Sequence, residues 1–209
     1  MSATAPEQPT RRGRPRARAS TSDLAPREQI LRAAAALISS SGIGATRVAD
    51  IAEEVGLTAP AIYYHFANLD EIVEALLDYV VGESAAFATT MAELEGRPAE
   101  RLHALVTQHV TRLTAGPYDL WFVAGVVAAE PGRYASIGRK ANQWRRAVAG
   151  LVAEGTAAGE LRDIDPAVAV AAVSGLVYGA LQHHHVGASV DATLIADLAV
   201  RALSRADGV

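Results

Sequence analysis

The 209-residue sequence contains no cysteine, and this absence excludes a disulfide framework, thiol chemistry and thiolate metal sites. It also lacks a positively charged start followed by an apolar stretch, so no secretory leader is recognised and we expect a cytoplasmic protein. No Gly-rich phosphate loop, nucleophile elbow or HExxH motif is present. We therefore expect neither an enzyme nor a cofactor.

Strand-like alternation of apolar and polar residues is also missing, and the apolar residues recur at helical spacing instead. Glycine and proline divide the chain between the expected helices. The sequence predicts an all-α fold of about nine helices. These are expected near residues 26–41, 46–55, 58–66, 68–80, 98–114, 118–130, 133–158, 166–186 and 191–205.

Residues 46–66 have the pattern of a helix-turn-helix, the motif that places its second helix in a DNA major groove. Thr46 is expected to N-cap the first helix and Gly56 to end it. In the second helix, Ile62 and Phe66 form a buried edge, which leaves the other faces for DNA. The first helix has one apolar stripe at i, i+3, i+4 and i+7, made of Val48, Ile51, Ala52 and Val55.

Any small helical bundle can contain such a helix pair, and the flanking segments favour DNA binding. Residues 26–41 carry apolar side chains on one face and stop at Gly42. Asn68 can cap a fourth helix, with Glu71 at the capping-box position. We therefore expect a compact DNA-reading head over residues 26–80, whose fourth helix connects it to the rest of the chain.

The head resembles the tetracycline-repressor (TetR) family of bacterial transcriptional regulators over about residues 27–80. The motifs that carry this resemblance are the run from Gln29 to Gly42, Thr46, Asp50-Ile51-Ala52, Gly56-Leu57-Thr58 and Ile62-Tyr63-Tyr64-His65-Phe66. The resemblance implies an all-α homodimer whose second helical domain binds a small molecule and releases the DNA. It also implies DNA contacts by Thr46, Thr58, Tyr63, Tyr64 and His65, to which we add Arg47, Ala59 and Ala61.

Cations are scarce in this head, where three arginines stand against eight acids between residues 27 and 80. Members of the family often have lysine where this chain has Ala59, and they usually have lysine where it has Leu69. A head this acidic is poorly equipped to meet phosphate unaided.

The first residues supply the missing charge. Residues 1–18 hold five arginines against one glutamate (net +4), whereas the remaining residues hold 14 basic against 22 acidic side chains (net −8). Pro, Gly and Ser around these arginines predict a flexible basic arm over residues 1–25. Two interpretations stay open: insertion into a narrow A·T minor groove, because Arg-Gly-Arg-Pro at 12–15 is similar to an AT-hook core, or a solvated tail that adds non-specific affinity. The candidate DNA contacts of the arm are Arg12, Arg14, Arg16 and Arg18.

Residues 81–209 are expected to bind an effector and a second subunit. Residues 166–190 carry no formal charge, a length that raises the question of a membrane span. Their Ala, Gly, Ser, Gln and His content favours instead a helix buried between the protein core and a partner subunit. This helix and the last one form the expected dimer interface through Val168, Ala172, Leu176, Leu194 and Leu198.

The effector pocket is expected among the helices that precede this interface. Its candidate lining residues are Trp121, Phe122, Trp144 and Tyr178 as aromatic walls, with His109 and Gln182 as polar contacts. Each residue has an alternative as a core filler or as a satisfied core histidine. Taken together they favour a hydrophobic or aromatic effector.

Three consecutive histidines, His183-His184-His185, invite a metal interpretation. Consecutive helical residues point about 100° apart, so the three cannot all reach one ion. We expect them at a helix end, where imidazoles meet terminal carbonyls, and predict no metal site.

The sequence thus predicts a repressor that an effector releases from a palindromic double-stranded DNA operator. The alternative that stays open is an architectural or effector-independent DNA-binding protein. Footprinting separates the two, because a regulator protects a discrete site and an architectural protein protects broadly. The sign of regulation depends on where the operator lies, which the chain does not encode.

Overall fold

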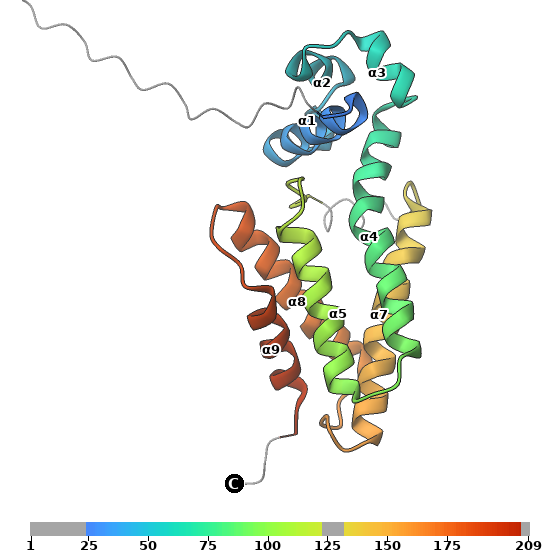
Figure 1. Cartoon of the computed structure of the whole chain (residues 1–209), viewed down its shortest axis with the longest axis vertical. Coiled ribbons are helices and arrows are strands. Elements are labelled where there is room, and N and C mark those ends of the chain that lie inside the picture. The colour runs from blue at the N-terminus through green and yellow to red at the C-terminus, as the bar shows by residue number, and fades with distance from the viewer. Residues whose placement is uncertain (1–23, 123–131, 206–209) are drawn as a thin grey trace, which may run out of the picture.

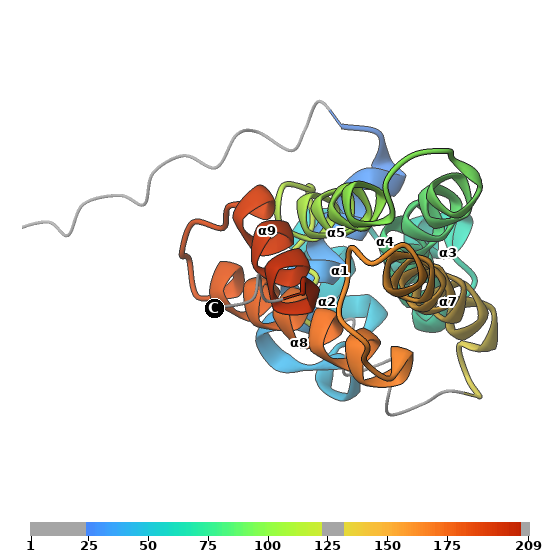
Figure 2. The ribbon, with the colours of Figure 1, turned by 90° about the horizontal axis from the view of Figure 1, so that it is seen from below.

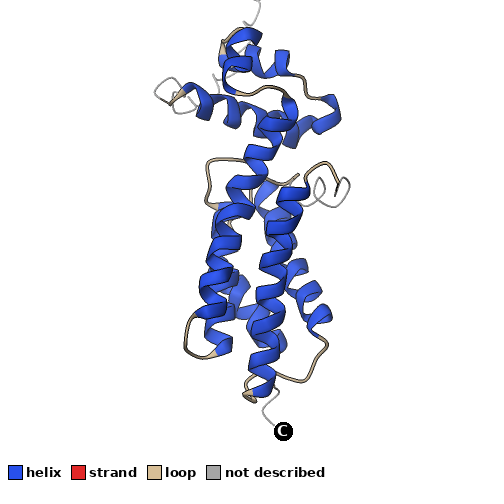
Figure 3. Ribbon diagram, turned by 90° about the vertical axis from the view of Figure 1, so that its right-hand side faces the viewer, coloured by secondary structure: helices blue, strands red, loops and turns tan. Residues whose placement is uncertain are grey.

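The computed structural model describes residues 24–122 and 132–205, and in these ranges it confirms the all-α prediction (Figure 1). The described residues form eight α-helices, one 3-10 turn and an isolated bridge between Leu161 and Ser204, with no strand among them (Figure 3). The helices are α1 (Pro26–Ser41), α2 (Val48–Val55), α3 (Ala59–His65), α4 (Leu69–Glu93), α5 (Pro98–Thr114), α7 (Ala135–Ala157), α8 (Pro166–His185) and α9 (Ala192–Leu203), with the 3-10 turn η2 (Ile43–Ala45) before α2.

The helix expected over residues 118–130 is the main departure from these predictions. Residues 118–122 form bends, a turn and irregular backbone, and residues 123–131 lie outside the described part of the chain. The predicted bounds of the other helices lie within a few residues of the observed ones, except at the end of the fourth helix. Helix α4 continues well past residue 80 and ends at Glu93.

A small head and a larger body share one long helix. Helices α1, α2 and α3 form the head, and α4 leaves it to run down the body beside α5 and α7 (Figure 1). Seen from below, α5 lies between the α4 and α7 side and the α8 and α9 side (Figure 2). Helix α5 packs against all four of these helices. It is therefore the central helix of the body.

The apolar residues predicted to face the core of the head do so. Ile51 and Ala52 of α2 are buried, and Val48 and Val55 at the ends of the same stripe are half-buried against the core. Burial of such side chains is the main favourable contribution to folding, at about 1.5–3 kcal/mol for each large aliphatic residue. The other buried apolar residues of the head and upper α4 include Ile30, Leu31, Ala34, Ile38, Ile62, Phe66, Ile72, Val73, Leu76, Leu77 and Val80.

Local capping fixes where several helices begin and end. Asn68 accepts a hydrogen bond from the backbone N–H of Glu71 at 2.9 Å, as predicted for the start of α4. The Glu71 carboxylate accepts from the N–H of Ala67 at 2.6 Å, one residue before the N-cap that a capping box would use. Gly56 ends α2 with φ of 69° and ψ of 26°, the left-handed conformation that favours glycine. Asp165 and Asp191 cap α8 and α9 through backbone N–H groups of the first turns.

Helices α8 and α9 present an apolar surface that this chain alone does not cover. Helix α8 is the one described helix long and apolar enough to span a membrane, yet only 28% of its most apolar window is buried. Val168 is 55% exposed, Leu194 53% and Leu198 45%. Ala172 is also exposed and Leu176 is half-buried. All five predicted interface residues thus lie on, or partly on, the outside of one subunit.

Candidate functional site

The recognition helix α3 is held by its apolar side and exposes its aromatic side. Ile62 and Phe66 are 0% and 2% exposed, so they fix the helix against the head. Tyr63 and Tyr64 are 54% and 87% exposed, an unusual exposure for such large rings. His65 is half-buried and meets the Tyr64 ring edge-on, with ring centroids 5.1 Å apart. The helix therefore offers two phenol groups and one imidazole to a ligand outside the head.

The start of α3 places smaller groups beside these rings. Thr58 is the N-cap residue and is exposed, although its side chain makes no capping hydrogen bond. Ala59 and Ala61 are half-buried. Pro60 occupies the first turn, where a missing N–H removes no helical hydrogen bond.

Thr46 has a different role from the one predicted. The N-cap of α2 is Arg47, whose backbone N–H donates to the Asp50 carboxylate at 3.0 Å. Thr46 is 7% exposed, and its hydroxyl donates to the carbonyl of Gly42 at 3.0 Å. The N-cap prediction is wrong because the 3-10 turn η2 brings Thr46 back onto the end of α1. The hydroxyl thus stabilises the entry into α2.

The head contains few cations for binding phosphate. Arg27 lies over the Phe66 ring at 4.9 Å, which places it near the end of α3. Arg32 pairs with Glu28 at 3.0 Å, and Arg47 is exposed. The predicted arm contacts Arg12, Arg14, Arg16 and Arg18 lie outside the described residues.

Two of the predicted effector residues meet inside the body, and we call His109 and Trp144 the interior pair. Their rings lie 4.7 Å apart between centroids, at 32°. Trp144 is 6% exposed, whereas His109 retains partial exposure. His109 Nδ1 shares a 2.7 Å hydrogen bond with the hydroxyl of Ser84, a buried residue of α4. Burial of the imidazole lowers the pKa of His109 to about 4, so the ring is neutral at neutral pH.

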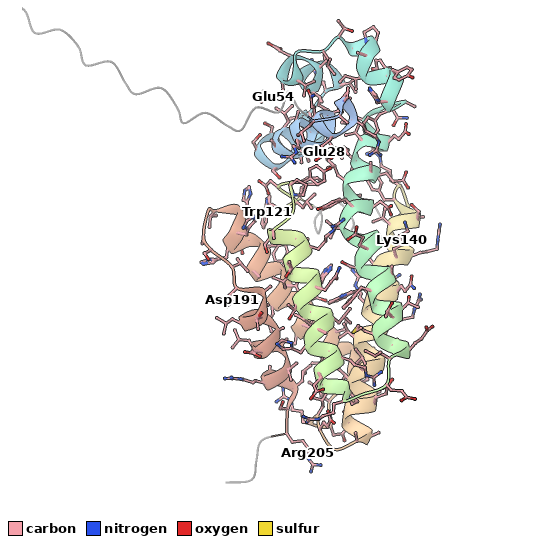
Figure 4. The ribbon with its side chains drawn as sticks, in the orientation of Figure 1. Glu28, Glu54, Trp121, Lys140, Asp191 and Arg205 are labelled. Carbon is pink, nitrogen blue, oxygen red and sulfur yellow. The ribbon has the colours of Figure 1, made fainter. Side chains whose placement is uncertain are left out.

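Two other predicted residues meet at the surface, and we call Trp121, Tyr178 and His185 the surface cluster. The Trp121 ring stacks on His185 at 5.3 Å and 13°, and it lies 5.6 Å from Tyr178. His185 also pairs with Asp119 at 2.9 Å. Tyr178 is 42% exposed. Figure 4 shows Trp121 at the end of the body that faces the head.

The six predicted effector residues therefore do not form one group. Phe122 is half-buried against the core, and Gln182 is exposed on α8. The structure brings together His109 with Trp144 and Trp121 with Tyr178, in two separate environments. Ser84 was not anticipated, because a serine among alanines 25 residues away from His109 carries no sequence signal of this contact.

The loop after α5 connects the body to the head, a role that the sequence did not indicate. The Tyr118 hydroxyl donates to the Glu28 carboxylate at 2.5 Å, and the Ser39 hydroxyl donates to the carbonyl of Asp119 at 3.0 Å. Burial and this hydrogen bond to Glu28 raise the pKa of Tyr118, which keeps its hydroxyl a donor. Since Asp119 also binds His185, this loop contacts α1 in the head and α8 in the body.

The three histidines lie in the last turn of α8, as predicted. Within the described ranges, no group of three or more His, Cys, Asp or Glu side chains has the geometry to hold a metal ion. His185 is instead engaged with Asp119 and Trp121.

The chain has a helix-turn-helix head with an exposed recognition helix, and one long helix joins this head to an all-α body. This arrangement defines a class of DNA-binding regulators. The family model described as "Bacterial regulatory proteins, tetR family" matches residues 30–76, and the one described as "Tetracyclin repressor-like, C-terminal domain" matches residues 95–205. The chain belongs to the TetR family of transcriptional regulators and is a DNA-binding protein of that family.

Individual relatives agree with this assignment. The crystal structure of Mycobacterium smegmatis AmtR is 31% identical, with 89% of both chains covered and a TM-score of 0.78. The regulator TtgR of Pseudomonas putida is 50% identical over 52 residues, and this match spans only 25% of the length of either protein. The crystal structure of AibR in complex with isovaleryl coenzyme A and operator DNA shares the fold, at 21% identity over 85% of this chain and 97% of AibR, with a TM-score of 0.68.

Proposed function

We propose that this protein is a cytoplasmic repressor that binds a palindromic operator as a homodimer and leaves it when a small hydrophobic or aromatic effector binds. Residues 26–80 would read the DNA, and residues 81–209 would bind the effector and the second subunit, without catalysis. The observation that carries the proposal is the exposure of Tyr63 and Tyr64 on a helix whose opposite side is locked into the core.

The proposed mode of DNA reading follows from the side chains of α3. The helix itself carries no lysine or arginine, so its outer face offers hydroxyl, aromatic and methyl groups to base edges and sugars. Phosphate neutralisation is left to Arg27, Arg47 and the arginines of the arm. We infer that α3 supplies shape and hydroxyl contacts and that the arm supplies most of the positive charge.

The proposed homodimer rests on the exposed apolar residues of α8 and α9. Leu194 and Leu198 lie one helical turn apart and are both exposed, as is Val168 of α8, and a contiguous apolar patch of this kind is typical of a subunit interface. A palindromic operator requires two recognition helices about 34–36 Å apart, so dimerisation would set their spacing. This arrangement would also bury the uncharged surface of α8.

An effector would release the DNA by favouring a subunit geometry in which the two heads are wrongly spaced. Only the difference between its affinities for the two geometries can shift the population. The loop around Tyr118 and Asp119 contacts both α1 and α8, and it would transmit such a change. AibR, whose solved complex holds isovaleryl coenzyme A and operator DNA, supports the idea that this fold accommodates both kinds of ligand.

The test is selection of binding sites from random double-stranded DNA, followed by footprinting of the selected sequence. We expect protection of one discrete, two-fold symmetric site. The double substitution Tyr63→Ala and Tyr64→Ala should reduce its affinity at least about tenfold, since removing a good interaction with a base costs about 1–3 kcal/mol. Leu94→Ala is the matched control, because Leu94 is 50% exposed and follows α4 at the end far from the head. Broad protection without a preferred sequence would favour the architectural alternative.

The role of the arm has a separate test. Deletion of residues 1–19 should weaken operator binding and flatten its salt dependence, by up to about 0.9 in the log–log slope for each phosphate that the arm neutralises in the full-length protein. The measurement is operator affinity by fluorescence anisotropy across a series of salt concentrations. An unchanged slope would show that the arm neutralises no phosphate.

A further inference from the structure

Trp144 carries a buried hydrogen-bond donor that is not used. The residue is 6% exposed, and its indole Nε1–H has no acceptor in the described part of the chain. Nearly all buried polar groups in folded proteins are paired, because an unmet donor loses its hydrogen bond to water without replacement. An additional hydrogen-bond acceptor at this donor would therefore be favourable.

The groups beside this donor are polar but uncharged. The His109 ring lies 4.7 Å from the Trp144 ring, and its Nδ1 is already bonded to Ser84. Because burial keeps this imidazole neutral, the interior pair adds no positive charge to the site. The unused donor thus belongs to a pair of packed, uncharged aromatic rings.

The charges around the site disfavour an anionic ligand. Helix α4 contains six acids and no lysine or arginine. The two arginines of α5 between residues 98 and 114 already pair with carboxylates. Arg101 binds the carbonyl of Met91 and the carboxylate of Glu154, and Arg112 binds the carbonyl of Tyr79 and the carboxylate of Glu83.

The remaining packed helices do not alter this balance. On α7, Lys140 pairs with Asp78, and Arg139, Arg145 and Arg146 are exposed. Helix α8 contains no lysine, arginine, aspartate or glutamate. A carboxylate buried against Trp144 would therefore be desolvated without a cation to compensate it.

We propose that the effector of this protein is an uncharged molecule whose carbonyl oxygen accepts a hydrogen bond from Trp144 Nε1 while its planar apolar part packs on the His109 and Trp144 rings. This inference rests on the proposed effector-binding function and adds the chemical class of the ligand. The specificity would then depend on one atom, Trp144 Nε1.

Three small probes of matched shape test the proposal on the wild-type protein. Acetophenone has the carbonyl oxygen, α-methylstyrene replaces that oxygen by a methylene group, and benzoate carries a negative charge. We expect acetophenone to bind about tenfold more tightly than α-methylstyrene, because it satisfies a donor that the hydrocarbon leaves unpaired. Benzoate should bind more weakly than acetophenone. Affinities are measured by isothermal titration calorimetry, and the indole N–H signals in nitrogen-15 NMR spectra of the wild-type protein show which tryptophan the probe contacts.

Two tryptophan variants locate the effect. Trp144→Phe retains an aromatic ring and removes the donor, so it should abolish the preference for acetophenone over α-methylstyrene. Trp121→Phe is the matched control. It should retain the preference for acetophenone, and its one remaining indole signal, from Trp144, should still move on binding. Equal affinities for the two neutral probes, tighter binding of benzoate, or no binding of acetophenone up to its solubility limit would overturn the proposal. Because the readout involves no DNA, these outcomes are independent of whether a discrete operator exists.

Discussion

The interior pair and the surface cluster are built from similar residues in opposite environments. Each combines a tryptophan with a histidine. Trp144 is 6% exposed and lies beside a neutral imidazole, whereas Trp121 stacks on a histidine that is paired with an acid at the surface. The interior pair lies among α4, α5 and α7, and the surface cluster joins the loop after α5 to the end of α8. Similar side chains therefore occupy two different environments.

The difference shows which groups are available to which ligand. In the interior pair, Trp144 is buried and offers an unpaired donor, which would suit a small molecule that supplies the missing acceptor. The surface cluster includes Tyr178, on the helix that exposes an uncharged surface, and it lies close to the loop that contacts α1. We expect the cluster to respond to the position of the second subunit and of the head.

The largest effect, on operator affinity, should come from placing charges on the exposed apolar surface of α8 and α9. The double substitution Leu194→Glu and Leu198→Glu places two charges where the proposed interface would bury apolar side chains. We expect a folded monomer whose operator affinity falls by about 10²–10⁴-fold, since bivalent binding is abolished. Sedimentation gives the oligomeric state, and anisotropy with the selected operator gives the affinity.

Arg145→Glu on the exposed face of α7 is the charge-changing control for this experiment. It should leave both the dimer and the affinity nearly unchanged. If the leucine variant stayed dimeric, the interface would lie elsewhere, and the comparison between an enclosed and an exposed surface would fail.

The next largest effect should be a difference in stability between variants of the two tryptophans. Trp144→Ala should lower the free energy of unfolding by about 3–5 kcal/mol, because it leaves a large cavity in the body. Trp121→Ala should cost about 1–2 kcal/mol, because Trp121 is half-buried. Urea unfolding at one fixed protein concentration measures both, since the stability of a dimer depends on concentration. Equal losses of stability would mean that Trp121 is buried as deeply as Trp144 in solution.

Local signals made most of the fold predictable. Pro26 and Gly42 bracket α1, and Pro98 begins α5, so the predicted bounds of both helices match the observed ones. The effect of proline in the first turn and of glycine after the last turn is local to the helix end, so these helix ends can be predicted from the sequence alone. The prediction that Thr46 is the N-cap of α2 failed because the neighbouring residue, Arg47, takes that position and its backbone N–H donates to Asp50. Which residue becomes the N-cap depends on how η2 folds back, since this turn directs the Thr46 hydroxyl to the carbonyl of Gly42.

The arrangement of the site was less accessible to sequence reasoning. The hydrogen bonds between Glu28 and Tyr118 and between Ser84 and His109 join residues 90 and 25 positions apart, and no spacing rule connects them. Helix α8 is uncharged along its whole length, so its sequence does not show which side the protein core covers. Trp121 and Trp144 are both aromatic residues of the body and look equivalent in the sequence, although one faces the surface and the other the interior.

The smallest effect should come from the pH dependence of stability at the interior pair. Burial lowers the pKa of His109 in the folded state to about 4, below the ordinary value of 6.5. The unfolded chain therefore takes up this proton first as the pH falls. Stability attributable to His109 should be present above pH 6.5 and be lost progressively between pH 6.5 and 4. The loss is at most about 3 kcal/mol, and we expect roughly 2 because the residue retains some exposure to solvent.

Comparison of wild-type protein with His109→Gln isolates this contribution, because carboxylates that titrate in the same range are common to both proteins. The quantity to compare is the change in the free energy of unfolding between pH 7 and about pH 4.5, so a uniform loss of stability in the variant does not affect the result. His184→Gln, in the last turn of α8, is the matched control and should behave as wild type. An identical pH dependence in all three proteins would show that His109 is solvated in the folded state. The interior pair would then share the environment of the surface cluster, and its neutral imidazole could not support selection of an uncharged effector.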